Sequence, residues 1–157
     1  MPVETADVTE ICAAHGNRPD ALLEILHDIQ HRDGHIAEAH LPAIARALNL
    51  SRAEVHGVVT FYHDFRREPA GRHVVKLCRA EACQSVAGGE TCAHAEKSLG
   101  VRLGGTTGDG RVTLEAVYCL GNCALGPAAM IDGRLHGRVD AARFDELIAG
   151  LDRKAAE

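Results

Sequence analysis

The chain has 157 residues, of which 46% are hydrophobic and 25% are charged, a composition typical of a globular protein with one or two domains. Aromatic residues make up only 3%, and the net charge is −5 with a sequence pI of about 6.0. These values exclude a base-stacking platform and a basic surface for nucleic acid. No apolar run approaches the ~18 residues of a membrane span, and the first residues lack the pattern of a secretory signal, so we expect a cytoplasmic protein.

Charge and breaker residues divide the chain near residue 70. Residues 1–70 carry 6 basic and 11 acidic side chains, whereas residues 71–157 carry 11 of each and five of the six cysteines. The segment Glu68-Pro-Ala-Gly71 lies between the two parts and is typical of a boundary. We therefore predict one domain over residues 1–70 and a second over residues 71–157.

Helical periodicity predicts a small bundle in the first domain. The expected helices are one from a cap at Asp7 and Glu10 to a stop at Gly16, one from Asn17-Arg-Pro-Asp20 to Asp33-Gly34, one from about Leu41 to Leu48, and one opened by Ser51-Arg-Ala-Glu54. The last start has the Ser and Glu spacing of a capping box, in which each side chain binds a free backbone N–H group.

Alternating strands and helices are predicted in the second domain. The expected elements are a strand at His73–Cys78, a helix from about Gly88 to Leu99, a turn-rich stretch at Gly104–Gly110, a strand at Val112–Tyr118, a hairpin of Ala128–Ile131 and Arg134–Val139 around Asp132-Gly133, and a helix from about Ala141 to Leu151. This order predicts a small α/β sandwich, so the fold class of the whole chain is α+β.

Two of the predicted strands end in a pair of cysteines. Four residues separate Cys78 from Cys83, three separate Cys119 from Cys123, and 35 lie between the pairs. Because strand ends at one edge of a sheet lie close in space, the pairs are expected to converge on one site with four thiolates. In a reducing compartment such a set binds zinc or an iron–sulfur cluster more often than it forms disulfides.

The spacing within the pairs favours a two-iron cluster. Structural zinc sites most often have two residues between paired cysteines, and neither pair here has that spacing. Zinc, a disulfide and inert thiols remain as alternatives. Gly121 and Asn122 tolerate positive φ and are expected to turn N–H groups toward cluster sulfides. Cys12 and Cys92 fall on apolar helix faces and are predicted to be buried.

No enzyme motif accompanies the cysteines. The glycine-rich stretch Leu103–Gly108 lacks the lysine of a phosphate-binding loop, and the sequence contains no Cys-x2-Cys for thioredoxin-type exchange. His27 and His31 share a helix face without a third ligand, so they are predicted to be solvated. We do not expect the chain to turn over a substrate by itself. The alternative is that it is a thiol-dependent redox enzyme.

The cysteine segments resemble a known family. Cys78-x4-Cys83 together with Cys119-Leu-Gly-Asn-Cys123 is similar to the thioredoxin-like [2Fe-2S] ferredoxins, which include the 24-kDa subunit of NADH:quinone oxidoreductase and diaphorase subunits of NAD-reducing hydrogenases. Three segments are most similar to the gamma subunit of NAD-dependent, molybdenum-containing formate dehydrogenase: His56–Arg66, Leu77–Cys83 and Cys123–Ile131. Respiratory members more often have Ala where this chain has Gly126.

The resemblance implies a fold and a set of ligands. A helical N-terminal part precedes a thioredoxin-like [2Fe-2S] ferredoxin domain, and one cluster is held by Cys78 and Cys83 on one iron and by Cys119 and Cys123 on the other. FMN and NAD are expected on a flavoprotein partner, and the molybdenum cofactor on a further subunit.

The function that the resemblance implies is electron transfer within a soluble NAD-dependent formate dehydrogenase. The alternatives are an equivalent subunit of an NAD-reducing hydrogenase or NADH:quinone oxidoreductase, or a binding module in which the four cysteines hold zinc. The acidic first domain, with Phe61, Tyr62 and Phe65, is expected to dock the partner; packing of these rings between the two parts of the chain is the other interpretation.

Overall fold

The computed structural model describes residues 5–154 and divides the chain into two compact units, Met1–Pro69 and Ala70–Glu157. The division falls in the segment rich in breaker residues. Each unit has its own hydrophobic core, and we describe each by itself.

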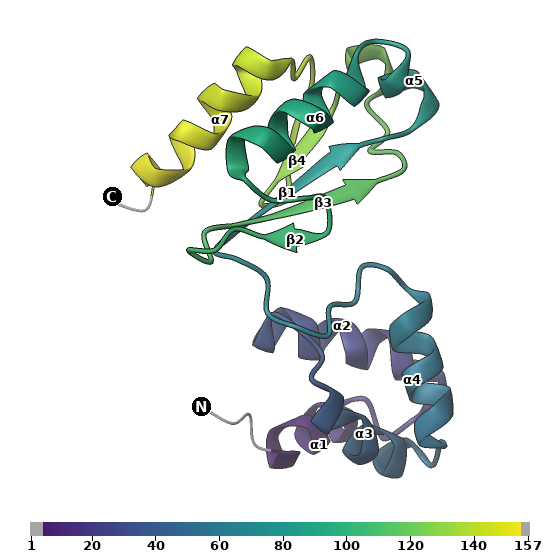
Figure 1. Ribbon diagram of the computed structural model, residues 1–157. Helices are drawn as coiled ribbons and strands as arrows, with labels where there is room; N and C mark the ends of the chain where they lie inside the picture. Colours follow the sequence, from purple (N-terminus) through teal and green to yellow (C-terminus); the bar gives the residue numbers. More distant parts are fainter. Residues whose placement is uncertain (1–4, 155–157) are drawn as a thin grey trace. The chain divides into compact units, whose positions relative to one another are not determined.

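The first unit is a bundle of four helices (Figure 1). Its elements are α1 (Thr5–Ala14), a 3-10 turn η1 (Pro19–Ala21), α2 (Leu22–Asp33), a second 3-10 turn η2 (Glu38–His40), α3 (Leu41–Leu48) and α4 (Arg52–Phe61). The core takes apolar side chains from every helix: Val8, Cys12, Leu22, Ile25, Leu26, Ile29, Ile36, Leu41, Ile44, Ala45, Leu48, Val55, Val59 and Phe65. The prediction that Cys12 is buried is therefore confirmed.

Local signals explain most helix ends in this unit. Gly34 ends α2 in the left-handed conformation with a φ of 76°. The predicted capping box opens α4, because Ser51 Oγ accepts the Glu54 N–H and the Glu54 carboxylate accepts the Ser51 N–H. The predicted cap of the first helix is wrong: α1 begins at Thr5, so Asp7 lies inside the helix.

The second unit contains a five-stranded mixed sheet (Figure 1). Its elements are β1 (His73–Cys78), a short helix α5 (Glu81–Gln84), α6 (Gly88–Leu99), β2 (Gly105–Thr106), β3 (Val112–Val117), a 3-10 turn η3 (Cys123–Leu125), β4 (Ala129–Ile131), β5 (Arg134–His136) and α7 (Ala141–Lys154). The strand order is β2-β3-β1-β4-β5. The predicted turn-rich stretch contains a short strand, β2, because Thr106 pairs with Thr113 of β3.

The two central strands, β1 and β3, are parallel, and this pairing determines where the cysteines lie. His73 is opposite Val112, and Cys78 is opposite Val117. Both strands therefore end at the same edge of the sheet, as the arrowheads in Figure 1 show. β4 pairs with β1 in the antiparallel direction, and the β4–β5 hairpin turns at Asp132 and Gly133, both with positive φ.

Helices α6 and α7 cover one face of this sheet (Figure 1). The core between them and the strands contains Val75, Leu77, Cys92, Ala95, Val112, Leu114, Ala129, Ile131, Val139, Phe144, Ile148 and Leu151. The opposite face carries Lys76 and Glu115, whose charged groups lie 3.8 Å apart. The predicted α+β class is confirmed. None of the helices within residues 5–154 is long and apolar enough to cross a bilayer.

Candidate metal centre

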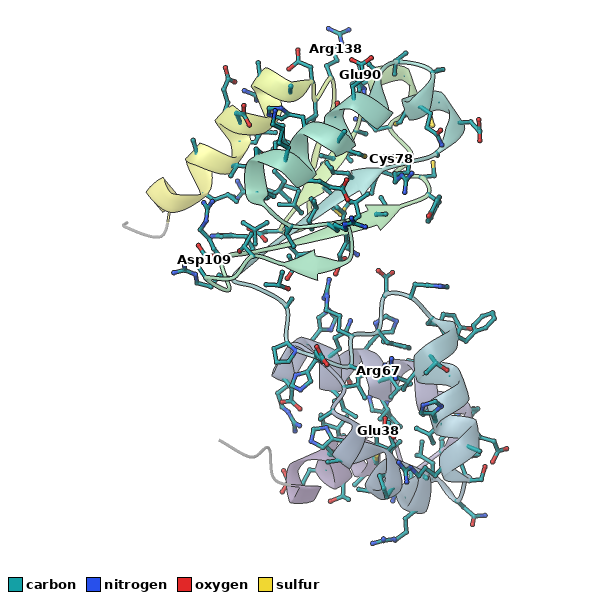
Figure 2. All side chains as sticks on the ribbon, viewed as in Figure 1. Glu38, Arg67, Cys78, Glu90, Asp109 and Arg138 are labelled. Carbon is teal, nitrogen blue, oxygen red and sulfur yellow. The ribbon has the colours of Figure 1, made fainter. Side chains whose placement is uncertain are left out.

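The first cysteine loop follows β1. Cys78 is the last residue of that strand (Figure 2), and its N–H donates to the carbonyl of Ala128 at 3.0 Å. Cys83 lies in α5, with its N–H on the carbonyl of Ala80 at 3.0 Å. Both cysteines are buried. The short helix therefore brings the second cysteine of the pair back toward the end of β1.

The second cysteine loop follows β3. The Sγ atoms of Cys119 and Cys123 are 3.9 Å apart, and both residues are exposed. Gly121 has a φ of 73°, as expected, and its N–H donates to Cys119 Sγ at 3.3 Å. Asn122, whose residue type tolerates either sign of φ, has a φ of −104°. Gly121 therefore supplies the left-handed turn that closes this pair.

The two loops meet because their strands are neighbours. Arg79, directly after Cys78, donates its N–H to the carbonyl of Val117 at 2.7 Å, where the second loop begins. Burial, a hydrogen bond with Cys78 and the charge of Cys123 raise the pKa of the Cys83 thiol. The pKa of Cys123 is raised mainly by its hydrogen bond and charge interaction with Cys119, and also by Cys78. Thiols of the two loops therefore interact electrostatically.

Backbone donors accompany both pairs of sulfurs. Besides Gly121, the N–H of Ala128 is hydrogen-bonded to the Cys83 thiol and lowers its pKa, opposing the larger effect of burial. A donated hydrogen bond stabilises negative charge on sulfur. Each loop thus holds one sulfur next to a main-chain N–H group.

The sulfur donors fit a two-iron cluster. They form two pairs: the Sγ atoms of Cys119 and Cys123 are 3.9 Å apart, and the Cys83 thiol is hydrogen-bonded to Cys78. A cluster of two irons takes two cysteine sulfurs on each iron, whereas a structural zinc ion takes four ligands around one point. The arrangement in pairs therefore matches the cluster better than it matches zinc.

The fifth cysteine of this unit, Cys92, lies near the site without joining either pair. It is buried on α6 in the core, as predicted, and desolvation raises the pKa of its thiol. The nearby Arg79 guanidinium lowers that pKa, and Cys78 raises it. Sequence reasoning placed Cys92 in the core but gave no sign that it lies within electrostatic range of Cys78, since 13 residues separate the two in the chain.

Exposed apolar side chains surround the cysteine loops. Tyr118, directly before Cys119, is 75% exposed, and Val86 and Leu125 are 46% and 42% exposed. Val86 follows α5, and Leu125 ends η3. Large exposed apolar side chains next to a functional site are candidates for contact with another protein. The sequence reasoning did not identify these three residues.

Comparisons with known proteins agree with this geometry. The family model of the thioredoxin-like [2Fe-2S] ferredoxins matches residues 8–152. The E subunit of NADH-quinone oxidoreductase from Pseudomonas aeruginosa is 40% identical over 119 residues, covering 76% of this chain and 72% of the relative. An E subunit of the same complex from Rhizobium meliloti is 34% identical over 151 residues, covering 96% and 89%. The Escherichia coli K12 protein of this type is 38% identical over 128 residues, covering 82% and 77%.

A solved structure shares the fold. An NAD+-reducing [NiFe]-hydrogenase in the air-oxidized state superposes with a TM-score of 0.70 and 30% identity, over 85% of this chain and 23% of the hydrogenase chain. This chain therefore corresponds to less than a quarter of that hydrogenase chain. The predicted family is confirmed: the chain belongs to the thioredoxin-like [2Fe-2S] ferredoxin family and is an electron-transfer protein with one [2Fe-2S] cluster.

Proposed function

We propose that this chain is the [2Fe-2S] subunit of an NAD-dependent formate dehydrogenase in the cytoplasm, and that it exchanges single electrons with a flavoprotein partner. The observation that carries the proposal is the convergence of two cysteine pairs at one edge of the sheet. Cys78 and Cys83 would bind one iron, and Cys119 and Cys123 the other. When bound, the cluster supplies a one-electron carrier.

The protein groups around the sulfurs would tune that carrier. The N–H groups of Gly121 and Ala128 donate toward Cys119 and Cys83 and disperse negative charge on the sulfurs. Such donors favour the reduced, more negative form and raise the reduction potential. Burial of Cys78 and Cys83 limits water on one side, whereas exposed Cys119 and Cys123 leave the other side open to a redox partner.

The exposed residues Val86, Tyr118 and Leu125 would contact the flavoprotein. Apolar and aromatic side chains are enriched at the centre of protein interfaces, where they exclude water. Burying them against the partner would also bring the cysteine loops close to the redox group of that partner. FMN and NAD would reside on this flavoprotein, and the molybdenum cofactor on a further subunit.

The helical unit would provide a second docking surface. A groove on this unit is lined by Leu22, Leu50, Val58, Phe61 and Tyr62, with Gly57 on its surface. Phe61 is 73% exposed, and its ring packs edge-on against Tyr62 with the centroids 5.1 Å apart. Phe65 is instead buried in the bundle, so only the first two rings are available for docking.

Gly57 supports this use of the groove. It lies inside α4, where glycine costs the helix about 0.5–1 kcal/mol relative to alanine. A Cβ at this position would meet nothing within 4 Å, so the fold does not require glycine there. The missing side chain at Gly57 leaves room on this face of α4 for a close contact with another chain.

The choice of formate dehydrogenase rests on the resemblance of the segments His56–Arg66, Leu77–Cys83 and Cys123–Ile131. Gly126, which differs from the respiratory pattern, is a weak discriminator: a Cβ there would lie 2.9 Å from Val86 Cγ2, and that exposed side chain can move. The alternative is the same electron-transfer role in an NADH-quinone oxidoreductase or in an NAD+-reducing hydrogenase. The similarity of this chain to E subunits of the first complex and to a chain of the second supports that alternative.

The test is anaerobic purification of the tagged chain with its partners. Two irons and two acid-labile sulfides per chain, with an EPR signal after dithionite reduction, support the cluster. Formate, hydrogen and NADH are then added separately to the oxidised complex. Reduction by formate and by NADH, but not by hydrogen, supports the formate dehydrogenase; reduction by hydrogen assigns the chain to a hydrogenase. A colourless zinc protein would overturn the redox function.

A further inference from the structure

We propose that Gly88 and Gly137 are positioning residues for the metal centre, each fixing one cysteine loop by backbone packing that leaves no room for a side chain. The inference rests on the proposed ligands. Neither glycine has a positive φ. An alanine could therefore adopt the same backbone conformation, and the requirement at both positions is one of space.

Gly88 packs directly on the backbone of the first loop. It is the buried first residue of α6. A Cβ at Gly88 would lie 2.5 Å from the carbonyl oxygen of Cys83 and 2.8 Å from its carbonyl carbon. Those atoms belong to the main chain and cannot rotate away, so a methyl group would have to shift the backbone of Cys83. Gly89, the next residue, meets nothing within 4 Å and is exposed.

Gly137 packs on the second loop in the same way. A Cβ there would lie 2.8 Å from Leu125 Cβ and 2.9 Å from both Leu125 O and Asn122 Nδ2. Asn122 directly precedes Cys123, and Leu125 ends η3 two residues after it. The loop is also tied to this segment, because the Arg138 N–H donates to Leu125 O at 2.7 Å. A methyl group at 137 would therefore push on the loop while this hydrogen bond holds it, and the displacement would reach Cys123.

The two glycines control different ligands. Gly88 touches the residue that carries one sulfur of the first pair, and Gly137 touches the neighbours of one sulfur of the second pair. Metal sites depend on such supporting contacts because they fix the orientation of the ligands. A displacement of either cysteine changes the geometry of sulfur around one iron and leaves the other pair in place.

The experiment compares Gly88→Ala and Gly137→Ala with Gly89→Ala as the matched control, all in the full chain. The readouts are far-UV circular dichroism of the apo-protein, the EPR g-values of the dithionite-reduced protein, and the rate of iron loss to a chelator. We expect native circular dichroism for all three variants. Gly88→Ala and Gly137→Ala should show shifted g-values and roughly ten- to a hundred-fold faster iron loss, the usual size of such supporting effects. Gly89→Ala should match the unmodified protein.

Each outcome decides the question. Unchanged g-values and iron loss in Gly88→Ala or Gly137→Ala overturn the inference for that residue. Loss of the native circular dichroism spectrum in the apo form also overturns it, because the glycine is then needed for folding in general. A shift in Gly89→Ala equal to that in Gly88→Ala shows an effect of α6 as a whole and overturns the role of Gly88. Replacement of Cys83 and Cys123 by Ser tests the ligands separately: if the cluster survives those changes, the proposed function fails first.

Discussion

Two buried cysteines of the second unit, Cys83 and Cys92, should respond in opposite ways to the same change. Cys83→Ser removes one of the four proposed ligands, so we expect the cluster to be lost. The free energy of unfolding of the apo-protein should fall by less than about 1 kcal/mol. The serine hydroxyl can accept the Ala128 N–H that is hydrogen-bonded to the Cys83 thiol in the unmodified protein. The variant should therefore be folded and colourless.

Cys92→Ser should keep the cluster and lose stability instead. Cys92 is 6% exposed within an apolar core, where a buried hydroxyl costs about 1–3 kcal/mol. Part of that cost is recovered if the hydroxyl bonds the carbonyl one turn earlier in α6. A net loss of about 1 kcal/mol corresponds to a melting temperature roughly 4–8 °C lower for a domain of this size.

The assay combines iron and sulfide content, EPR of the reduced protein, and thermal unfolding of the apo-protein by circular dichroism. Two irons and an unchanged spectrum in Cys83→Ser would refute the role of Cys83 as a ligand. Loss of the cluster in Cys92→Ser, with the apo form melting at the original temperature, would show that Cys92 acts at the site instead of in the core.

Three further predictions concern pH, docking and the helical unit. Burial raises the pKa of the Cys83 and Cys92 thiols above the ordinary 9.0, so the stability of the apo-protein should be fully present below pH 9.0 and fall as pH rises through the raised values; a flat melting temperature above pH 9.0 would contradict this. Gly57→Gln fills the groove on the helical unit and should reduce the amount of partner that co-purifies with an intact cluster. Gly57→Ala should have a smaller effect. If both variants recover the same amount of partner, the groove is not part of the interface. Ser51→Ala breaks the capping box of α4 and should lower the free energy of unfolding, measured with denaturant, by about 0.5–2 kcal/mol. Ser98→Ala is the control and should lower it less, because the Ser98 hydroxyl makes only a 3.4 Å hydrogen bond within its own helix.

The sequence by itself determined the parts of this protein that depend on neighbouring residues. The capping box at Ser51, the end of α2 at Gly34 and the hairpin at Asp132-Gly133 were predictable, because each follows from the conformational preferences of a few adjacent residues. The cysteine pairs were visible for the same reason, since each is a short local spacing at the end of an apolar strand.

Only the tertiary structure decided how these parts form one site. The parallel register of β1 and β3 places Cys78 opposite Val117 and so starts the second loop beside the first. Close packing between elements is likewise set by the tertiary structure. Gly88 of α6 packs on Cys83 of α5, and Gly137 packs on the second cysteine loop. The negative φ of Asn122 shows the same limit, because its residue type allows both signs and the surrounding loop selects one. Local preferences thus determine where elements begin and end, while sheet pairing and close packing between elements determine the distances that a metal centre requires.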